Sequence, residues 1–124
     1  MRREIILIGE DNYTNYALLI AYIGDSDYET LWAKNGKEAI DMFIEHPDID
    51  IILMDINMPV MNGDIAAKKI KEINSNIPII AITAYYRGKF DETYFDGVIQ
   101  KPIISSSNLM KSINEHINKY RNNT

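Results

Sequence analysis

Short apolar runs alternate with segments of helical periodicity along this chain, and this alternation constrains the fold more than any other feature. EIILIG (4–9) is the first run of strand length. IDIILM (49–54), IPIIAI (77–82) and, less strongly, GVIQ (97–100) are apolar enough to be buried on both faces. Such runs are typical of the centre of a parallel sheet, because helices cover both of its faces. YETLWA (28–33) is partly polar, which indicates an edge strand, and GVIQ (97–100) is a weaker fifth strand.

The segments between these runs have the apolar spacing of helices. Residues 12–24 are largely apolar and end at Gly24, a residue that suits the end of a helix. Asn35 followed by Glu38 resembles a capping box at the start of a second helix, which Pro47 ends. Two further apolar stripes are formed by Ile65, Ala66, Ile70 and Ile73 and by Leu109, Ile113, His116, Ile117 and Tyr120.

Segment 84–96, AYYRGKFDETYFD, is the least regular part of the chain. It is aromatic and charged, and Gly88 inside it disfavours a regular helix, so we expect a fourth helix that is short or irregular. Five strands with about five helices indicate an α/β domain with a doubly wound five-stranded parallel sheet flanked by helices.

Composition narrows the class of protein. The 124 residues, of which 46% are hydrophobic, suit one domain over 1–124 with a single core. No cysteine is present, no signal peptide is evident in MRREIILIGED, and no segment is long and apolar enough to span a membrane, so we expect a cytoplasmic protein without membrane contact. A net charge of -5 argues against a surface that binds nucleic acid directly.

Polar residues follow the ends of four predicted strands. Glu10 and Asp11 end the first strand, Asp55 the third, Thr83 the fourth and Lys101 the fifth. The carboxyl ends of parallel strands meet at one edge, so we expect these side chains to converge. A single acid at such a place is usually a helix cap or a solvated charge, but capping does not explain all four endings. Three carboxylates with a hydroxyl and an ammonium suit Mg²⁺ beside a phosphate.

Four motifs resemble those of the receiver domain of two-component signalling. They are LIGEDN, ILMDINMPVMNG, IIAITA and VIQKPI, and the match runs from the first strand to the last helix. The particular residues found in and around these motifs are most similar to those in receivers of hybrid sensor histidine kinases. The stretches that carry this similarity are EDNYTN, WAKNGKEAI and LMDINMP. The resemblance implies a flavodoxin-like sheet of the receiver type, as a module of such a kinase. A stand-alone single-domain response regulator is the alternative assignment.

The resemblance also implies a metal site. Asp11 and Asp55, with the backbone carbonyl of Asn57, would bind Mg²⁺ or Mn²⁺. Glu10 would act largely through a bound water. A metal and a lysine together supply the charge neutralisation on which phosphoryl transfer depends.

The phosphoryl chemistry implied by the resemblance centres on Asp55. This residue would accept a phosphoryl group from a phosphohistidine on a histidine kinase or a histidine phosphotransfer domain. Lys101 would pair with the phosphoryl oxygens, and Thr83 would hydrogen-bond to them. The domain would thereby promote its own aspartyl phosphorylation and dephosphorylation, as a monomer or weak dimer.

Three other interpretations fit the sequence less well. A haloacid-dehalogenase-like phosphatase also uses an aspartate at a strand end, but it requires a second aspartate two positions on, where this chain has Asn57. A flavodoxin-like nucleotide binder would need a Gly, Ser or Thr phosphate loop after the first strand, where this chain has the acidic EDN. A degenerate receiver that is not phosphorylated is the third, and the complete set of site residues argues against it.

Two residues at the fifth strand bear on the resemblance to receivers. Val98 differs from the usual residue, and Pro102 agrees with it. Receivers usually carry Tyr or Phe three residues before the lysine, whereas this chain has Val98. We therefore expect little signalling through an aromatic switch at this strand. Pro102 follows Lys101, and the resemblance implies a cis peptide bond between them.

Overall fold

The computed structural model describes residues 3–24, 27–85 and 88–122. Its elements are β1 (Glu4–Gly9), α1 (Tyr13–Ile23), β2 (Tyr28–Ala33), α2 (Gly36–Glu45), β3 (Ile51–Met54), α3 (Gly63–Ile73), β4 (Ile79–Thr83), β5 (Gly97–Gln100) and α4 (Ser106–Asn122). Within the described ranges, no helix combines the length and the apolar character needed to cross a membrane.

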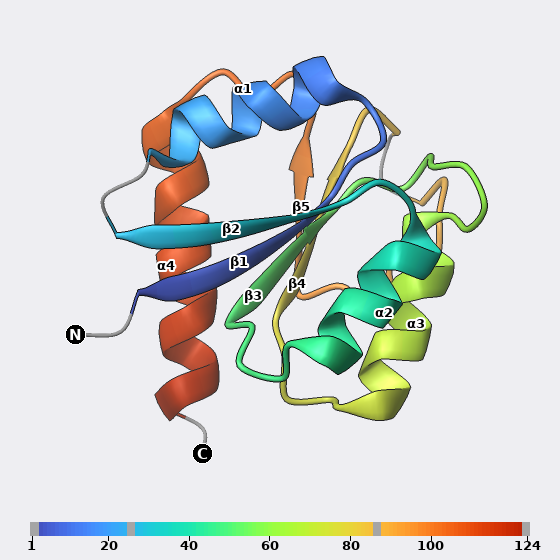
Figure 1. Ribbon diagram of the computed structural model, residues 1–124. Helices are drawn as coiled ribbons and strands as arrows, with labels where there is room; N and C mark the ends of the chain where they lie inside the picture. The colour runs from blue at the N-terminus through green and yellow to red at the C-terminus, as the bar shows by residue number, and fades with distance from the viewer. Residues whose placement is uncertain (1–2, 25–26, 86–87, 123–124) are drawn as a thin grey trace.

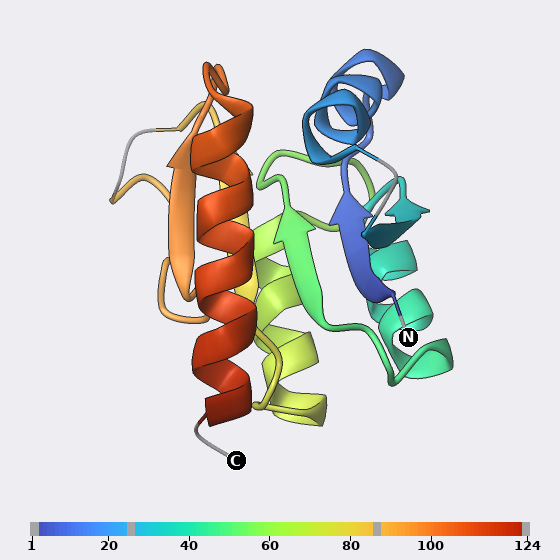
Figure 2. The same cartoon turned by 90° about the vertical axis from the view of Figure 1, so that its left-hand side faces the viewer.

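The five strands form one sheet in the order β2-β1-β3-β4-β5, and every neighbouring pair is parallel (Figure 1). Helices α2 and α3 lie on one face of this sheet, and α1 and α4 lie on the other, with α4 in front in Figure 2. The predicted doubly wound parallel sheet is confirmed, and β2 is an edge strand as its polar residues indicate.

The core forms two apolar layers because successive strand residues point to opposite faces. In β1, Ile5 and Leu7 pack in the layer under α2 and α3, while Ile6 and Ile8 pack in the layer under α1 and α4. Strands β3 and β4 are likewise buried along their whole lengths. Burial on both faces explains why these runs are continuously apolar.

Side-chain caps define where the first two helices begin. The Asn12 carboxamide oxygen accepts a bond from the backbone N–H of Asn15 at 3.0 Å, and that of Asn35 accepts one from Glu38 at 2.9 Å. The Glu38 carboxylate in turn accepts the backbone N–H of Lys34 at 3.1 Å. The predicted cap of α2 is therefore confirmed, with the reciprocal bond displaced by one residue from the usual capping box.

The prediction of a short or irregular fourth helix is wrong. The fourth helix in chain order is α4, which is 17 residues long, and its buried stripe is formed by Leu109, Ile113 and Ile117. Residues 84–85 and 88–96 contain no helix, and residues 86–87 lie outside the described ranges.

Local side-chain bonds explain why residues 88–96 form turns. The Glu92 carboxylate accepts the backbone N–H of Gly88 at 2.6 Å, and the Asp91 carboxylate accepts that of Thr93 at 3.0 Å. Such bonds offer the backbone an alternative to helical hydrogen bonds. Gly88 also has a φ of 87°, which is outside the right-handed helical region.

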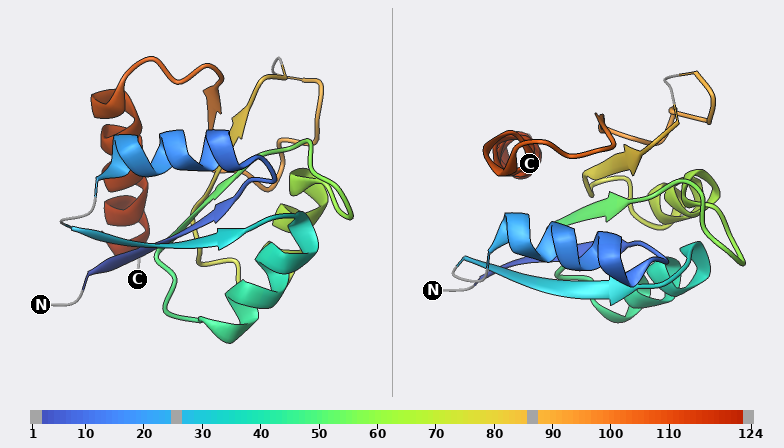
Figure 3. Two further views of the ribbon diagram at one scale, coloured as in Figure 1. Left: turned by 45° about the horizontal axis from the view of Figure 1, so that its top comes forward. Right: turned by 90° about the horizontal axis from the view of Figure 1, so that it is seen from above.

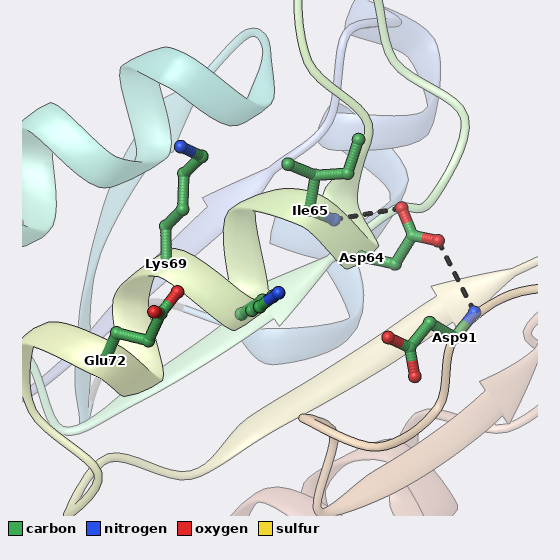
Figure 4. A pocket seen from close by; sticks show the side chains of 6 residues that line it. Asp64, Ile65, Lys69, Glu72 and Asp91 are labelled. Atoms are coloured by element: carbon green, nitrogen blue, oxygen red, sulfur yellow. Dashed lines mark hydrogen bonds between the residues drawn. The ribbon is translucent and has the colours of Figure 1, made fainter.

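A cavity of about 360 Å³ separates this turn segment from the outer side of α3 (Figure 4). Asp64 lies at its rim, with one carboxylate oxygen bonded to the N–H of Ile65 and the other 3.4 Å from the N–H of Asp91. Its other lining residues are Ile65, Lys68, Lys69, Glu72 and Asp91. The lining carries charges of both signs and contains none of the predicted site residues.

A polar cluster ties the start of β5 to two helices at the opposite end of the sheet from the predicted site. The Lys71 ammonium lies 3.0 Å from the Asp96 carboxylate and donates to the hydroxyl of Tyr120 at 2.7 Å. That hydroxyl donates to the second Asp96 oxygen at 2.5 Å, while Asp96 also accepts the backbone N–H of Ile79. Burial, followed by the bond to Asp96, raises the pKa of Tyr120.

We expect Asp96→Ala to lower the free energy of unfolding by about 2 to 3 kcal/mol, because it leaves the strand N–H of Ile79 without its acceptor and removes the carboxylate that balances the largely buried Lys71 ammonium, which keeps only uncharged oxygen partners on Ile77 and Tyr120. Urea denaturation followed by circular dichroism is the measurement. The control is Asp41→Ala, which removes one partner of an exposed pair with Lys37 and should cost less than about 0.5 kcal/mol. Equal losses in the two variants would show that the cluster does not stabilise the fold.

Candidate functional site

The carboxyl ends of the central strands meet at one edge of the sheet, as the arrowheads in Figure 3 show. Glu10 and Asp11 follow β1, Asp55 follows β3, Thr83 ends β4 and Lys101 follows β5. A cavity of about 280 Å³ opens at this edge. Its lining consists of Asp11, Asp55, Asn57, Thr83, Ala84, Tyr85 and Lys101. The structure therefore brings the sequence-predicted residues together.

Three carboxylates form an acidic cluster beside this cavity. One carboxylate oxygen from each of Glu10, Asp11 and Asp55 lies within 4.8 Å of the others. The three side chains differ in solvent exposure. Glu10 is only 1% exposed, Asp55 is partly exposed and Asp11 is exposed. Three oxygen donors at this separation suit a hard cation.

Lys101 is the positive charge that faces this cluster. Its ammonium nitrogen lies 2.9 Å from Glu10 Oε1 and 3.2 Å from Asp55 Oδ2. Burial by itself lowers the pKa of the Lys101 ammonium, but the bond to Glu10 and the charge of Asp55 outweigh it, so the pKa is raised. The ammonium is therefore held in its charged form beside Asp55.

Glu10 is held on both carboxylate oxygens. Oε1 accepts from Lys101, and Oε2 accepts from the backbone N–H of Asn12 at 3.1 Å. Burial is the largest influence on this carboxyl and raises its pKa, and the bonds from Lys101 and Asn12 only partly oppose it. Both oxygens thus have protein partners, whereas the exposed Asp11 carboxylate accepts no hydrogen bond from the part of the chain that the structure describes.

Asp55 is fixed by the start of the loop that follows it. Its Oδ1 accepts the backbone N–H of Ile56 at 2.7 Å, which turns Oδ2 towards Lys101. Gly63 lets α3 approach this loop, since a Cβ atom there would lie 1.9 Å from the Asp55 carbonyl oxygen. A side chain at position 63 would therefore push α3 away from the end of β3.

Thr83 is buried at the end of β4. Its hydroxyl oxygen accepts the backbone N–H of Tyr85 at 3.0 Å, and its carbonyl accepts the N–H of Lys101 at 2.8 Å. The peptide bond between Lys101 and Pro102 is cis, as predicted. Val98 pairs with Ala81 and is partly buried.

Sequence reasoning missed the residues that support the acidic pair. The indole nitrogen of Trp32 donates to the backbone carbonyl of Glu10 at 2.7 Å. The only sequence signal for this contact is that a tryptophan stands next to the last residue of the edge strand, whose neighbour β1 carries the acids. Ala84 and Tyr85 also line the cavity, and they lie in the segment for which an irregular helix was expected.

Comparisons with known proteins agree with this arrangement. Residues 6–114 match the response regulator receiver domain family. The chain is 37% identical over 127 residues to hybrid signal transduction histidine kinase I of Dictyostelium discoideum, which covers 93% of this chain and 7% of that protein. It is 38% identical over 104 residues to the polar-differentiation response regulator DivK of Brucella anthropi, which covers 79% of this chain and 84% of that protein.

Solved structures show the same fold. The response regulator TrrA of Thermotoga maritima, in complex with Mg²⁺-BeF, is 27% identical with a TM-score of 0.83, over 91% of this chain and 98% of that one. A receiver domain protein of Methanospirillum hungatei is 21% identical with a TM-score of 0.87, over 99% of this chain and 100% of that one. With its family match over residues 6–114 and its strand-end residues gathered at one edge, the chain belongs to the response regulator receiver domain family, the phosphoacceptor module of two-component signalling.

Proposed function

We propose that Asp55 is the residue that accepts the phosphoryl group, from a phosphohistidine on a histidine kinase or a histidine phosphotransfer domain. The observation that carries this proposal is the placement of the Asp55 carboxylate, which lies 3.2 Å from the Lys101 ammonium and within the acidic cluster, at a cavity. In the reaction a carboxylate oxygen of Asp55 forms a bond to phosphorus as the P–N bond breaks. The imidazole nitrogen keeps the electron pair of that bond.

Lys101 and Thr83 are proposed to stabilise the transferred group. The Lys101 ammonium is already beside Asp55 and offers positive charge to the phosphoryl oxygens. The Thr83 hydroxyl oxygen accepts a bond from Tyr85, and that bond leaves the hydroxyl hydrogen free to be donated. Each residue thus supplies a donor at the place where negative charge accumulates.

We also propose that the site holds Mg²⁺ or Mn²⁺. Asp11, Asp55 and the backbone carbonyl of Asn57 would hold the cation, and Glu10 would act indirectly because both of its carboxylate oxygens already have protein partners. Three carboxylates against one ammonium leave negative charge that favours a cation. When bound, the cation neutralises charge on the phosphoryl oxygens.

We expect Mg²⁺ to raise the melting temperature of the wild-type chain, because a ligand that binds only the folded state stabilises it. Asp11→Ala should remove most of this response, since Asp11 is the exposed carboxylate of the cluster. A thermal melt titrated with Mg²⁺ is the measurement, with Asp41→Ala as the control for loss of one exposed carboxylate on α2. If Asp11→Ala responds to Mg²⁺ like the wild type, Asp11 is not a ligand.

The proposed setting is the receiver module, over residues 1–124, of a hybrid sensor histidine kinase in the cytoplasm. It is supported by similarity to kinases of this kind, of which the chain spans only a small part, 7% of the Dictyostelium discoideum protein. A stand-alone regulator that works as a monomer or weak dimer is the second candidate, supported by coverage of 84% of DivK. The sequence of the gene distinguishes the two candidates. A reading frame that encodes a histidine kinase domain joined to residues 1–124 would support the hybrid kinase.

The test of the proposed function is phosphorylation of the purified chain by acetyl phosphate with and without Mg²⁺. Intact-mass spectrometry should show one added phosphoryl group that depends on the metal and is lost in alkali, as an acyl phosphate is. Borohydride reduction followed by peptide sequencing should place the group on Asp55. A stable phosphoryl group on another residue, or none at all, would contradict the proposal.

A further inference from the structure

Trp32 and its neighbour Ala33 both bind the backbone of Glu10, the first residue of the acidic pair. The backbone N–H of Glu10 donates to the carbonyl of Ala33 at 2.9 Å, and the indole nitrogen of Trp32 donates to the carbonyl of Glu10 at 2.7 Å. Strands β1 and β2 pair in parallel up to Gly9 and Ala33. The first bond continues the backbone bonding between the strands by one residue, and the second adds a side-chain donor, so Glu10 is held by both its backbone N–H and its carbonyl.

The indole ring is itself held in place by α1. It stacks on Tyr16 with a centroid distance of 4.3 Å and an angle of 7° between the rings. Tyr13 lies against it at 5.8 Å, and the Lys34 ammonium lies 5.1 Å from its centre. A ring with these neighbours has little freedom to rotate, so its N–H stays directed at Glu10.

The carbonyl that Trp32 binds belongs to the peptide unit that joins Glu10 to Asp11. Because a peptide unit is planar, fixing its oxygen also fixes the direction in which Asp11 leaves the strand. The Asp11 carboxylate accepts no hydrogen bond from any residue in the ranges 3–24, 27–85 and 88–122. The direction of its side chain therefore depends on the backbone.

We propose that Trp32 is a positioning residue for the metal site, which holds the Glu10 carbonyl so that the Glu10 and Asp11 carboxylates stay aligned with Asp55. This inference rests on the proposed Mg²⁺ site. Groups that orient metal ligands without touching the metal commonly affect metal affinity by about 10- to 100-fold. Trp32 orients the backbone between two acids, so we expect an effect at the lower end of that range.

The first test compares Mg²⁺ affinity, measured by titration calorimetry, in the wild type, Trp32→Phe and Tyr16→Leu. Phenylalanine keeps an aromatic ring but removes the donor, so Trp32→Phe should bind Mg²⁺ about tenfold more weakly. Tyr16→Leu removes the stacking partner but keeps the donor, and Tyr13 and Lys34 still flank the ring, so its affinity should fall by less than that of Trp32→Phe. An unchanged affinity in Trp32→Phe, or a weakening in Tyr16→Leu that matches or exceeds that of Trp32→Phe, would show that the N–H does not position the site and would overturn the proposal.

The same variants separate positioning from general loss of structure. The Mg²⁺ concentration for half-maximal phosphorylation by acetyl phosphate should rise about tenfold in Trp32→Phe, while the rate at saturating Mg²⁺ stays near that of the wild type. A lower saturating rate with an unchanged half-maximal concentration would contradict the inference. If the wild type binds no Mg²⁺, the proposed metal site fails; if it binds and Trp32→Phe binds equally well, only the role of Trp32 fails.

A second test needs no variant. Trp32 is the only tryptophan of the chain, so its indole N–H gives a single resonance in an NMR spectrum. We expect this proton to exchange with solvent much more slowly than that of a free indole, and its chemical shift to move with Mg²⁺ at the same midpoint as the calorimetric titration. Fast exchange, or a shift that does not respond to Mg²⁺, would overturn the proposal.

Discussion

Asp55→Asn is expected to abolish phosphoryl incorporation, with a rate at least about a thousandfold below that of the wild type, because an amide is not a nucleophile towards phosphorus. The fold should be retained. The asparagine carboxamide oxygen has the same position as Oδ1 and can accept the bond from Ile56, while Lys101 keeps its contact with Glu10 at 2.9 Å. Intact-mass spectrometry after incubation with acetyl phosphate and Mg²⁺ is the measurement.

The matched control for this substitution is Asp64→Asn. Asp64 lies in the first turn of α3, and its carboxylate contacts the backbone N–H groups of Ile65 and Asp91 rather than the acidic cluster. This variant should gain a phosphoryl group at the wild-type rate. A wild-type rate in Asp55→Asn would show that the acceptor is another residue.

Lys101→Met is expected to impair both stability and phosphorylation. Glu10 is 1% exposed and would lose its ammonium partner, while three carboxylates would face one another, so the free energy of unfolding should fall by about 3 kcal/mol without metal. Loss of the charge beside the phosphoryl group should slow phosphorylation by about a hundredfold. Denaturation in the presence of EDTA and the acetyl phosphate assay measure the two effects.

The stability lost in Lys101→Met should depend on pH. Burial raises the pKa of Glu10, and loss of the bond from Lys101, which lowers it, would raise it further. A carboxyl with a raised pKa in the folded state favours folding when protonated. The deficit should therefore be small below about pH 4.3, the usual value for glutamate, and grow as the pH rises towards neutrality.

Lys101→Arg is the control, because it keeps a positive charge at this position and changes only the arrangement of the N–H donors. It should retain most of the stability and should show little of this pH dependence. If Lys101→Met were as stable as the wild type at neutral pH, the ion pair with Glu10 would not contribute to the fold. If it were phosphorylated at the wild-type rate, Lys101 would have no part in transfer.

Local rules of sequence were sufficient for most of the architecture. Continuous apolar runs predicted the buried strands β3 and β4, because a strand covered on both faces has no solvent-facing positions, whereas β5, for which the same was predicted less strongly, is partly exposed. Asn35 and Glu38 predicted the start of α2 because a cap acts within one helical turn. The convergence of the site followed from the geometry of any parallel sheet, whose strand ends share one edge.

The same local rules failed for residues 84–96. Its aromatic and charged residues, with Gly88 among them, predicted a short or irregular helix, but residues 88–96 form turns, held by the side chains of Asp91 and Glu92. Helical propensity and side-chain bonds to the backbone compete at similar energies, so the sequence of this segment did not determine which prevails. Tertiary packing then places Phe95 against the core and Phe90 against Phe95, with ring centroids 5.9 Å apart.

The sequence by itself determined which residues stand at the strand ends, and therefore the donor set of the site. Only the tertiary structure decided that Glu10 is buried while Asp11 is exposed, and that Trp32 binds the Glu10 carbonyl while Lys101 binds its carboxylate. Along the chain, Trp32 is 22 positions from Glu10, and Lys101 is 91 positions from it. No local pattern specifies them, because the burial of a carboxylate and the partner that it finds depend on how whole strands and helices pack.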